Sequence, residues 1–295
     1  MIPLSLSGME SVVVLYASPN RLAQFSHWAL LSIALLILCS CRREAPAPQP
    51  APSATTATAP VAPVAPVTGE LKDVVETTSN YVIGISYPPS ASKYPGLAAE
   101  LKRYAEAARA DLLEAAAERR PDAPAPYDLS LSFTQVLDSP TLVAVAADGS
   151  SYTGGAHGAP LLERFVWLPQ QNRRLRASDL VPDAQGWSAI SGYVREQLHT
   201  ALSQRIDADD LDSTQRAEVI KNAGRMIDDG TEADAAHFAQ FEPVMGRDGK
   251  VAALRFVFAP YQVGPYSDGT QTVDVPASVL LPFVAPDYRP LFSGG

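Results

Sequence analysis

The chain has 295 residues, and its 23 Lys and Arg against 32 Asp and Glu give a formal net charge of −9. Because binding of nucleic acid needs clustered Lys and Arg, this balance argues against a nucleic-acid partner and favours a basic protein partner. Both cysteines lie close together near the N-terminus, so we expect the folded part to be stabilised by a hydrophobic core and not by disulfides.

The first feature along the chain is an apolar run of 11 residues, Trp28–Leu38, preceded by an arginine. A membrane-spanning helix needs about 20 apolar residues, whereas the core of a secretory signal needs roughly 7 to 15, so the run predicts a signal peptide. With Leu38 three positions before it and Ser40 directly before it, Cys41 occupies the position at which bacterial lipoproteins receive their lipid. We therefore expect residues 1–40 to be a lipoprotein signal peptide and Cys41 to attach the chain to a membrane.

Alternatives stay open in this region. Cleavage before Cys39 would place the bulky Leu38 at the last signal position, and an N-terminal anchor that is not cleaved would also fit the apolar run. The residues before the arginine fit a signal poorly, so we expect translation to start downstream of the first printed residue, near Met9 or later. Cys41 is followed by Arg42 and not by Asp, which is typical of lipoproteins sent to the outer membrane, where the protein would face the periplasm.

Residues 41–69 form the next segment, which we expect to be the lipidated cysteine and a linker. Within it, Ala45–Gly69 contains seven prolines and almost no charge. Repeated proline fixes the backbone angle φ and removes hydrogen-bond donors, so the segment is expected to be extended and similar to polyproline. At about 3.1 Å per residue it could span on the order of 75 Å, enough to hold a domain away from a membrane.

Residues 70–160 have the composition of a folded α+β unit. Runs of β-branched and aromatic residues predict strands, and apolar residues at a spacing of three and four predict an amphipathic helix that proline terminates. The expected elements are a strand, a helix and two strands joined by a turn at Asp138-Ser139-Pro140: Tyr81–Tyr87, Gly96–Glu118, Leu129–Thr134 and Leu142–Ala147.

Residues 161–290 are expected to form a second unit. Asp212 with Gln215 three positions later predicts a helix that begins with a capping box, and Asp248-Gly249 between two apolar runs predicts a hairpin. The expected elements are a strand, two helices, the hairpin, a strand and a short helix opened by proline: Leu161–Leu168, Trp187–Ala201, Asp212–Met226, Phe238–Met245 with Val251–Phe258, Gln271–Val275 and Pro276. Helices and strands are grouped more than they alternate, so we expect an α+β fold with antiparallel sheets, packed helices and two closely associated subdomains.

No motif in the sequence indicates catalysis. His157, His199 and His237 are far apart along the chain and none belongs to a His-Glu-x-x-His motif, so a zinc site could arise only through the tertiary fold. Ser90-Ala-Ser-Lys93 lacks the partner motifs of the β-lactamase class, and the acidic residues at 207–212 lack the glycine that a calcium loop needs. We therefore expect no catalytic residues, no metal site and no cofactor.

Two glycine-containing strings are unusual: residues 152–158, YTGGAHG, and residues 258–269, FAPYQVGPYSDG. Adjacent glycines give the backbone freedom to bring polar side chains together, and Tyr and His supply both ring faces and hydrogen-bonding atoms. The alternative is that both strings are structural turns. The candidate ligand-binding residues are Tyr152, Gly154, Gly155, His157, Tyr261 and Tyr266.

These two strings, together with LRASDLV at residues 175–181 and VDVP at residues 273–276, resemble the RsiV-type extracytoplasmic domain over Glu70–Pro286. That domain family is shared with the anti-sigma factor RsiV and with peptidoglycan deacetylases of the PdaC type, and it is described as a domain of unknown function. The resemblance implies an α+β domain of the cell envelope, which in RsiV binds lysozyme. The printed sequence has neither an anti-sigma segment nor a deacetylase domain, so we expect neither of those activities.

Together these observations predict a membrane-anchored periplasmic lipoprotein with a domain that binds and does not catalyse. Its expected partner is a lysozyme-like hydrolase or peptidoglycan, and its membrane contact is the lipid on Cys41. An enzyme of unrecognised type that acts on cell-wall sugars, with His157 as acid or base, is one alternative. A purely structural envelope lipoprotein is another.

Overall fold

The structure is a computed structural model that describes residues 71–120, 125–208 and 211–295. The predicted signal peptide, residues 1–40, the predicted lipidation site Cys41 and the linker at 41–69 all lie outside the described residues. Within the part of the chain that the structure describes, no helix is both long and apolar enough to cross a membrane.

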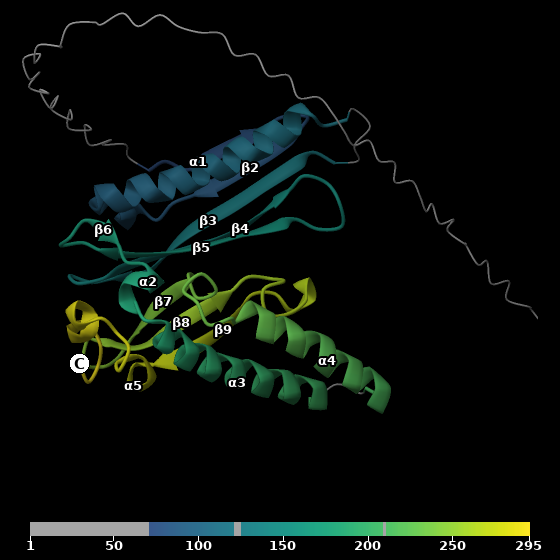
Figure 1. The fold of residues 1–295 in the computed structure, drawn as a ribbon. Helices are drawn as coiled ribbons and strands as arrows, with labels where there is room; N and C mark the ends of the chain where they lie inside the picture. The colour runs from purple at the N-terminus through teal and green to yellow at the C-terminus, as the bar shows by residue number, and fades with distance from the viewer. Residues whose placement is uncertain (1–70, 121–124, 209–210) are drawn as a thin grey trace, which may run out of the picture. The chain divides into compact units, whose positions relative to one another are not determined.

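The first subdomain is a six-stranded sheet with one long helix along its face (Figure 1). Its strands follow one another in sequence order across the sheet: β1 Val74–Thr77, β2 Tyr81–Ser86, β3 Tyr127–Asp138, β4 Val143–Tyr152, β5 Ala159–Leu168 and β6 Arg173–Arg174. A 3-10 turn, η1 Pro89–Lys93, leads into the helix α1, Pro95–Ala117. The helix buries an apolar stripe that includes Leu97, Leu101 and Leu112 against the sheet.

The sheet is antiparallel, as expected, apart from one pair of strands. β2 and β3 run parallel, with Ile83 opposite Leu129, and α1 forms the connection between them. Parallel neighbours require a crossover of a dozen or more residues, which a helix supplies. The predicted strand, helix and strand in this region are therefore confirmed, but they form a crossover unit and not an antiparallel pair.

The second subdomain is a three-stranded antiparallel sheet with two long helices packed beside it (Figure 1). Its strands are β7 Phe241–Met245, β8 Val251–Phe258 and β9 Gln271–Pro276, and its long helices are α3 Ala184–Ala208 and α4 Ser213–Gly230. Shorter elements complete it: α2 Ala177–Leu180, α5 Ala277–Leu280, and the 3-10 turns η2 Tyr266–Asp268 and η3 Pro286–Leu291.

Two local signals in this subdomain are confirmed. Asp212 Oδ1 accepts hydrogen bonds from the backbone N–H groups of Thr214 and Gln215, at 2.8 and 2.9 Å. The side-chain oxygen of Gln215 in turn accepts a hydrogen bond from the backbone N–H of Asp212. Gly249 lies in the turn between β7 and β8 and has φ +75°. This is the left-handed conformation that an Asp-Gly hairpin turn requires. β7 begins at Phe241 and not at Phe238, because Phe238 is buried in the preceding loop and stacks on Trp187 at 5.6 Å.

The two sheets share a core and a buried ionic contact. Ala144 and Val166 of the six-stranded sheet belong to the same buried cluster as the apolar side chains of the second subdomain. Arg164 on β5 is 7% exposed, and its Nε lies 2.6 Å from Glu242 Oε1 on β7, an ion pair in which the N–H is not aligned for a hydrogen bond. β5 and β6 extend the first sheet to residue 174, past residue 161, where we expected the second subdomain to begin.

Candidate functional site

The two glycine-containing strings meet in the folded chain. His157, in the β4–β5 loop, places its Nε2 2.8 Å from the hydroxyl oxygen of Tyr261, in the β8–β9 loop. The His157 ring stacks on Tyr266 with centroids 3.9 Å apart and planes 14° apart, and the two tyrosine rings are 5.6 Å apart. We call His157, Tyr261 and Tyr266 the aromatic cluster. It joins one loop of each subdomain.

The β4–β5 loop holds His157 in place through its own hydrogen bonds. Gly154 and Gly155 have φ +107° and +96°, which a residue with a side chain rarely adopts, and the Tyr152 hydroxyl donates to the Gly155 carbonyl at 3.3 Å. His157 Nδ1 lies 3.1 Å from the Gly158 carbonyl, which can only accept, so Nδ1 carries the proton. In the neutral ring Nε2 is then the acceptor, and the Tyr261 hydroxyl donates to it.

Tyr261 has an unusual backbone. Its φ of +74° is left-handed, which costs about 1–2 kcal/mol for a residue other than glycine, and its side chain is 52% exposed. The neighbouring Gln262 fixes this conformation by donating from Nε2 to the carbonyls of Gly230, at 3.1 Å, and His237, at 2.9 Å. Val263, on the other side, is buried. The surrounding contacts therefore hold a strained residue so that its phenol projects toward His157.

A cleft of about 280 Å³ adjoins the aromatic cluster. Tyr266 and Pro260 line it from the β8–β9 loop, and Asp148 and Ser150 line it from β4. Asp148 is half exposed and receives a hydrogen bond from Arg164 Nη2 at 2.9 Å, so its carboxylate is oriented by a buried cation. The cleft thus combines an aromatic ring with a carboxylate and a hydroxyl.

The sequence identified some of these residues and missed others. It selected His157, Tyr261 and Tyr266, which the fold brings together, whereas Gly154 and Gly155 shape the loop and Tyr152 hydrogen-bonds within that loop. The cleft residues Asp148, Ser150 and Thr270 were not selected, and no motif surrounds them. Gly149, beside Asp148, is needed there because a Cβ would lie 2.0 Å from a backbone oxygen of β3, but this crowding is visible only in the fold and not in the sequence.

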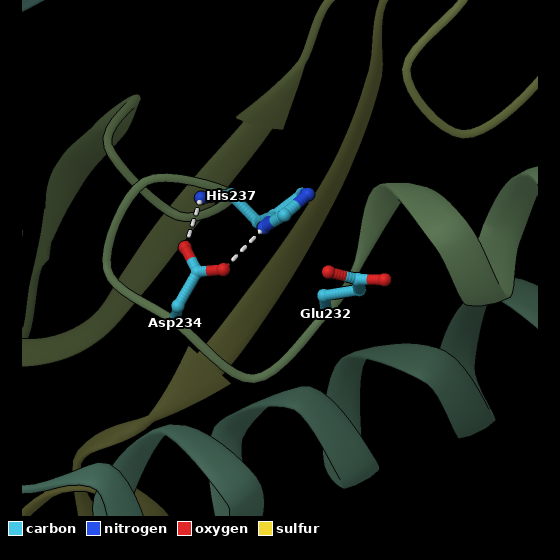
Figure 2. Close-up of side chains that lie close together, drawn as sticks. All are labelled: Glu232, Asp234 and His237. Atoms are coloured by element: carbon cyan, nitrogen blue, oxygen red, sulfur yellow. Dashed lines mark hydrogen bonds and ion pairs between the residues drawn. The ribbon is translucent and has the colours of Figure 1, made fainter. Parts of the chain in front are cut away.

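A second group of polar side chains lies in the α4–β7 loop (Figure 2). Glu232, Asp234 and His237 each offer one ligand atom, and these atoms all lie within 4.8 Å of one another. We expected no metal site because the histidines have no close partner histidine in the sequence. That criterion concerns histidine pairs only, so it does not apply to this group of one histidine and two carboxylates.

Asp234 is the centre of this group. Although partial burial of the carboxyl works in the opposite direction, hydrogen bonds from the backbone N–H groups of His237 and Ala236 lower its pKa below the usual value. The Asp234 carboxylate also lies 2.9 Å from His237 Nδ1, as the dashed line in Figure 2 shows. Asp234 is therefore ionised at neutral pH and orients the imidazole.

The comparisons with known proteins find a family match for about a third of the chain. Residues 178–278 match a family described as protein of unknown function, DUF3298, and this stretch includes Tyr261 and Tyr266 but not His157.

The chain is similar to a solved member of that family from Bacteroides fragilis NCTC 9343, with 16% identity and a TM-score of 0.43. It is also similar to a DUF3298 family protein from Pseudomonas aeruginosa PAO1, with 18% identity and a TM-score of 0.47. Each comparison covers 76% of this chain and 96% of the other. No curated protein matches the chain. Residues 178–278, most of which lie in the second subdomain, are therefore similar to a family that is described as having unknown function.

Proposed function

We propose that the chain is a lipid-anchored protein of the bacterial cell envelope whose folded domain binds peptidoglycan or a lysozyme-like hydrolase without catalysing a reaction. The observation that carries the proposal is the aromatic cluster, in which two sequence strings from different subdomains converge beside a cleft. Binding sites typically combine aromatic faces with a few oriented polar groups in a concave surface.

The contacts of His157 favour binding over catalysis. A general base needs a free nitrogen and a group that orients the ring, most often a carboxylate. In the described residues His157 makes its two polar contacts with the Gly158 carbonyl and the Tyr261 hydroxyl, and no carboxylate hydrogen-bonds to it. The ring is therefore better placed to hold Tyr261 and Tyr266 than to transfer a proton.

Peptidoglycan is supported by the chemistry of the cleft. Sugar rings have hydroxyl groups at their edges and apolar C–H faces, and tyrosine offers an apolar ring together with a polar hydroxyl. Tyr261 and Tyr266 would supply the aromatic faces, while Asp148 and Ser150 would accept and donate hydrogen bonds.

A lysozyme-like hydrolase is supported by a different observation, the net charge of −9. An acidic surface increases the association rate with a strongly basic partner and reduces binding to acidic proteins. The resemblance of the two strings to the RsiV-type domain points in the same direction. The two ligands are distinguished by salt, because binding of a basic protein would weaken steeply as salt rises, whereas stacking of uncharged sugar rings on tyrosine would change little.

The lipid anchor is the second part of the proposal. Cys41 would carry the lipid and the proline-rich residues 45–69 would hold the domain away from the membrane. Expression of Cys41→Ser in a diderm bacterium should move the protein from the membrane fraction to the periplasmic fraction and abolish incorporation of labelled palmitate. Unchanged labelling would exclude Cys41 as the lipidation site.

The binding claim is tested by calorimetry with lysozyme and by co-sedimentation with purified peptidoglycan. We expect Tyr261→Ala to weaken the interaction with the true ligand at least about tenfold, as truncation of an aromatic anchor typically does. Val75→Ala is the control, because Val75 is 83% exposed on the edge strand β1, which β2 and β3 separate from β4. Absence of binding to both ligands by the unmodified chain would overturn the proposal.

A further inference from the structure

The α4–β7 loop carries a second group of polar side chains that the aromatic cluster does not use. Glu232, Asp234 and His237 lie within six positions of one another in the sequence, and one ligand atom from each lies within 4.8 Å of the other two. In Figure 2 the imidazole of His237 lies between the two carboxylates. Imidazole nitrogen and carboxylate oxygen are the ligands that divalent transition metals share.

We propose that Glu232, Asp234 and His237 bind a divalent transition-metal ion, with Zn²⁺ the best match to this set of donors. The site shares no side chain with the aromatic cluster, and it does not depend on the function proposed above.

The loop that carries the three donors is held at both ends. Thr231 is fully buried and its hydroxyl donates to the Ile227 carbonyl at 2.6 Å, while Phe238 is 1% exposed in the core. The carbonyl of His237 accepts a hydrogen bond from Gln262 Nε2 at 2.9 Å. Because folding itself orders the six-residue segment, little conformational entropy remains to be lost when an ion binds.

The spacing of the closest pair of donors suits a metal ion. His237 Nδ1 and Asp234 Oδ2 are 2.9 Å apart. Two ligands that are each about 2.1 Å from an ion are about 3.0 Å apart at right angles and about 3.4 Å apart in a tetrahedron. An ion that replaced the shared proton would therefore need only a small opening of this pair, and a Glu232 oxygen would complete the set of three. Asp234 Oδ1 would keep its hydrogen bonds to the backbone, which orient the carboxylate.

The local charge also favours a cation. Glu232 and Asp234 bring two carboxylates together, and within the described part of the chain neither forms an ion pair with a lysine or arginine. A neutral imidazole would leave both charges uncompensated, whereas a divalent ion would neutralise them.

The donor set also selects among metals. One nitrogen among three donors is unfavourable for Ca²⁺ and Mg²⁺, which take oxygen ligands, and the absence of sulfur from the set is unfavourable for Cu⁺. Zn²⁺ accepts this mixture, and water would fill its remaining position.

The experiment is a calorimetric titration of the purified full chain with Zn²⁺. The protein carries no affinity tag, and Cys39→Ser and Cys41→Ser are present in every variant, because cysteines and histidine tags bind zinc on their own. We expect one equivalent of Zn²⁺ to bind, His237→Ala to weaken the affinity by about 100-fold, and Glu232→Gln to weaken it by about 10-fold. Bound Zn²⁺ should also raise the melting temperature of the parent chain but not that of His237→Ala.

His199→Ala is the matched control. His199 Nε2 lies 3.1 Å from Asp228 Oδ1. The two form an exposed pair of histidine and carboxylate that has no third ligand within the described residues. Its loss should leave the zinc affinity unchanged. Glu232 is exposed, so Glu232→Gln keeps the test valid even if His237→Ala disturbs the fold. The proposal is overturned if the chain binds no Zn²⁺ at millimolar concentration, or if one equivalent binds equally well to Glu232→Gln and His237→Ala.

Discussion

Two of the groups of packed aromatic rings in the described part of the chain have similar geometry and different surroundings. In the first subdomain Tyr87 stacks on Phe133 with centroids 4.8 Å apart and planes 9° apart, and Tyr104 meets Phe133 edge to face at 6.2 Å. In the aromatic cluster His157 stacks on Tyr266 at 3.9 Å, and Tyr261 lies beside them. Ring stacking alone therefore does not distinguish a core from a candidate binding surface.

Burial, backbone conformation and polar contacts do distinguish them. Phe133 lies on a regular strand and is 3% exposed, and burial raises the pKa of Tyr87 and Tyr104 to about 12. Tyr261 has a left-handed backbone and is 52% exposed. The buried group stabilises the fold, whereas the exposed one keeps a strained residue at the surface, which is the pattern of a functional site.

The largest expected effect that separates the two groups is on stability. Phe133→Ala should lower the free energy of unfolding by about 3–5 kcal/mol, because it removes a buried ring and leaves a cavity. Tyr261→Ala should change it by less than about 1 kcal/mol, since the ring is half exposed. Urea denaturation followed by circular dichroism measures both. Similar losses for the two variants would mean that the aromatic cluster is part of the core.

A smaller effect is expected in alkali. Burial, followed by the nearby charges of Glu106 for Tyr87 and Glu163 for Tyr104, holds both pKa values near 12, whereas unfolded tyrosine titrates near 10. The stability that these neutral phenols contribute is complete below pH 10 and is lost as the pH rises from about 10 to about 12.

The measurement is urea denaturation at pH 9 and above, for the parent chain and for the double variant Tyr87→Phe, Tyr104→Phe. Discounting for partial exposure to solvent, we expect the parent to lose about 2 kcal/mol more than the double variant over this range. Parallel stability curves would show that these phenols do not resist ionisation.

The smallest effect concerns the backbone of Tyr261. Tyr261→Gly and Tyr261→Ala both remove the ring, but only glycine adopts φ +74° without strain. Tyr261→Gly should therefore be more stable than Tyr261→Ala by about 1 kcal/mol, as measured by the difference in urea midpoint. If alanine is equally stable, the loop relaxes and the left-handed conformation is not enforced.

Local signals predicted most elements of the fold. The Asp212 capping box, the turn at Gly249 and the apolar stripe of α1 each depend on residues within a few positions of one another, and each is confirmed. The parallel pairing of β2 with β3 and the position of the subdomain boundary depend on contacts between distant segments. Hydrophobic periodicity identifies a strand but does not identify its neighbour.

The candidate site shows the same division. Glycines close to aromatic residues marked both loops, but the contact between His157 and Tyr261 joins residues 104 positions apart. Asp148 and Glu232 are acidic residues in an acidic chain, and nothing in their sequence neighbours separates them from others on the surface. Only the fold shows that one lines a cleft and that the other lies beside His237.

The most direct test of the central claim is the affinity of the chain for peptidoglycan and for lysozyme before and after the aromatic cluster is altered. We expect one of these ligands to bind the parent chain, and Tyr261→Ala with His157→Ala to weaken that binding at least about tenfold while the free energy of unfolding stays within about 1 kcal/mol. Val75→Ala should bind like the parent. Undiminished binding by the doubly substituted chain would contradict the assignment of the aromatic cluster as the binding site.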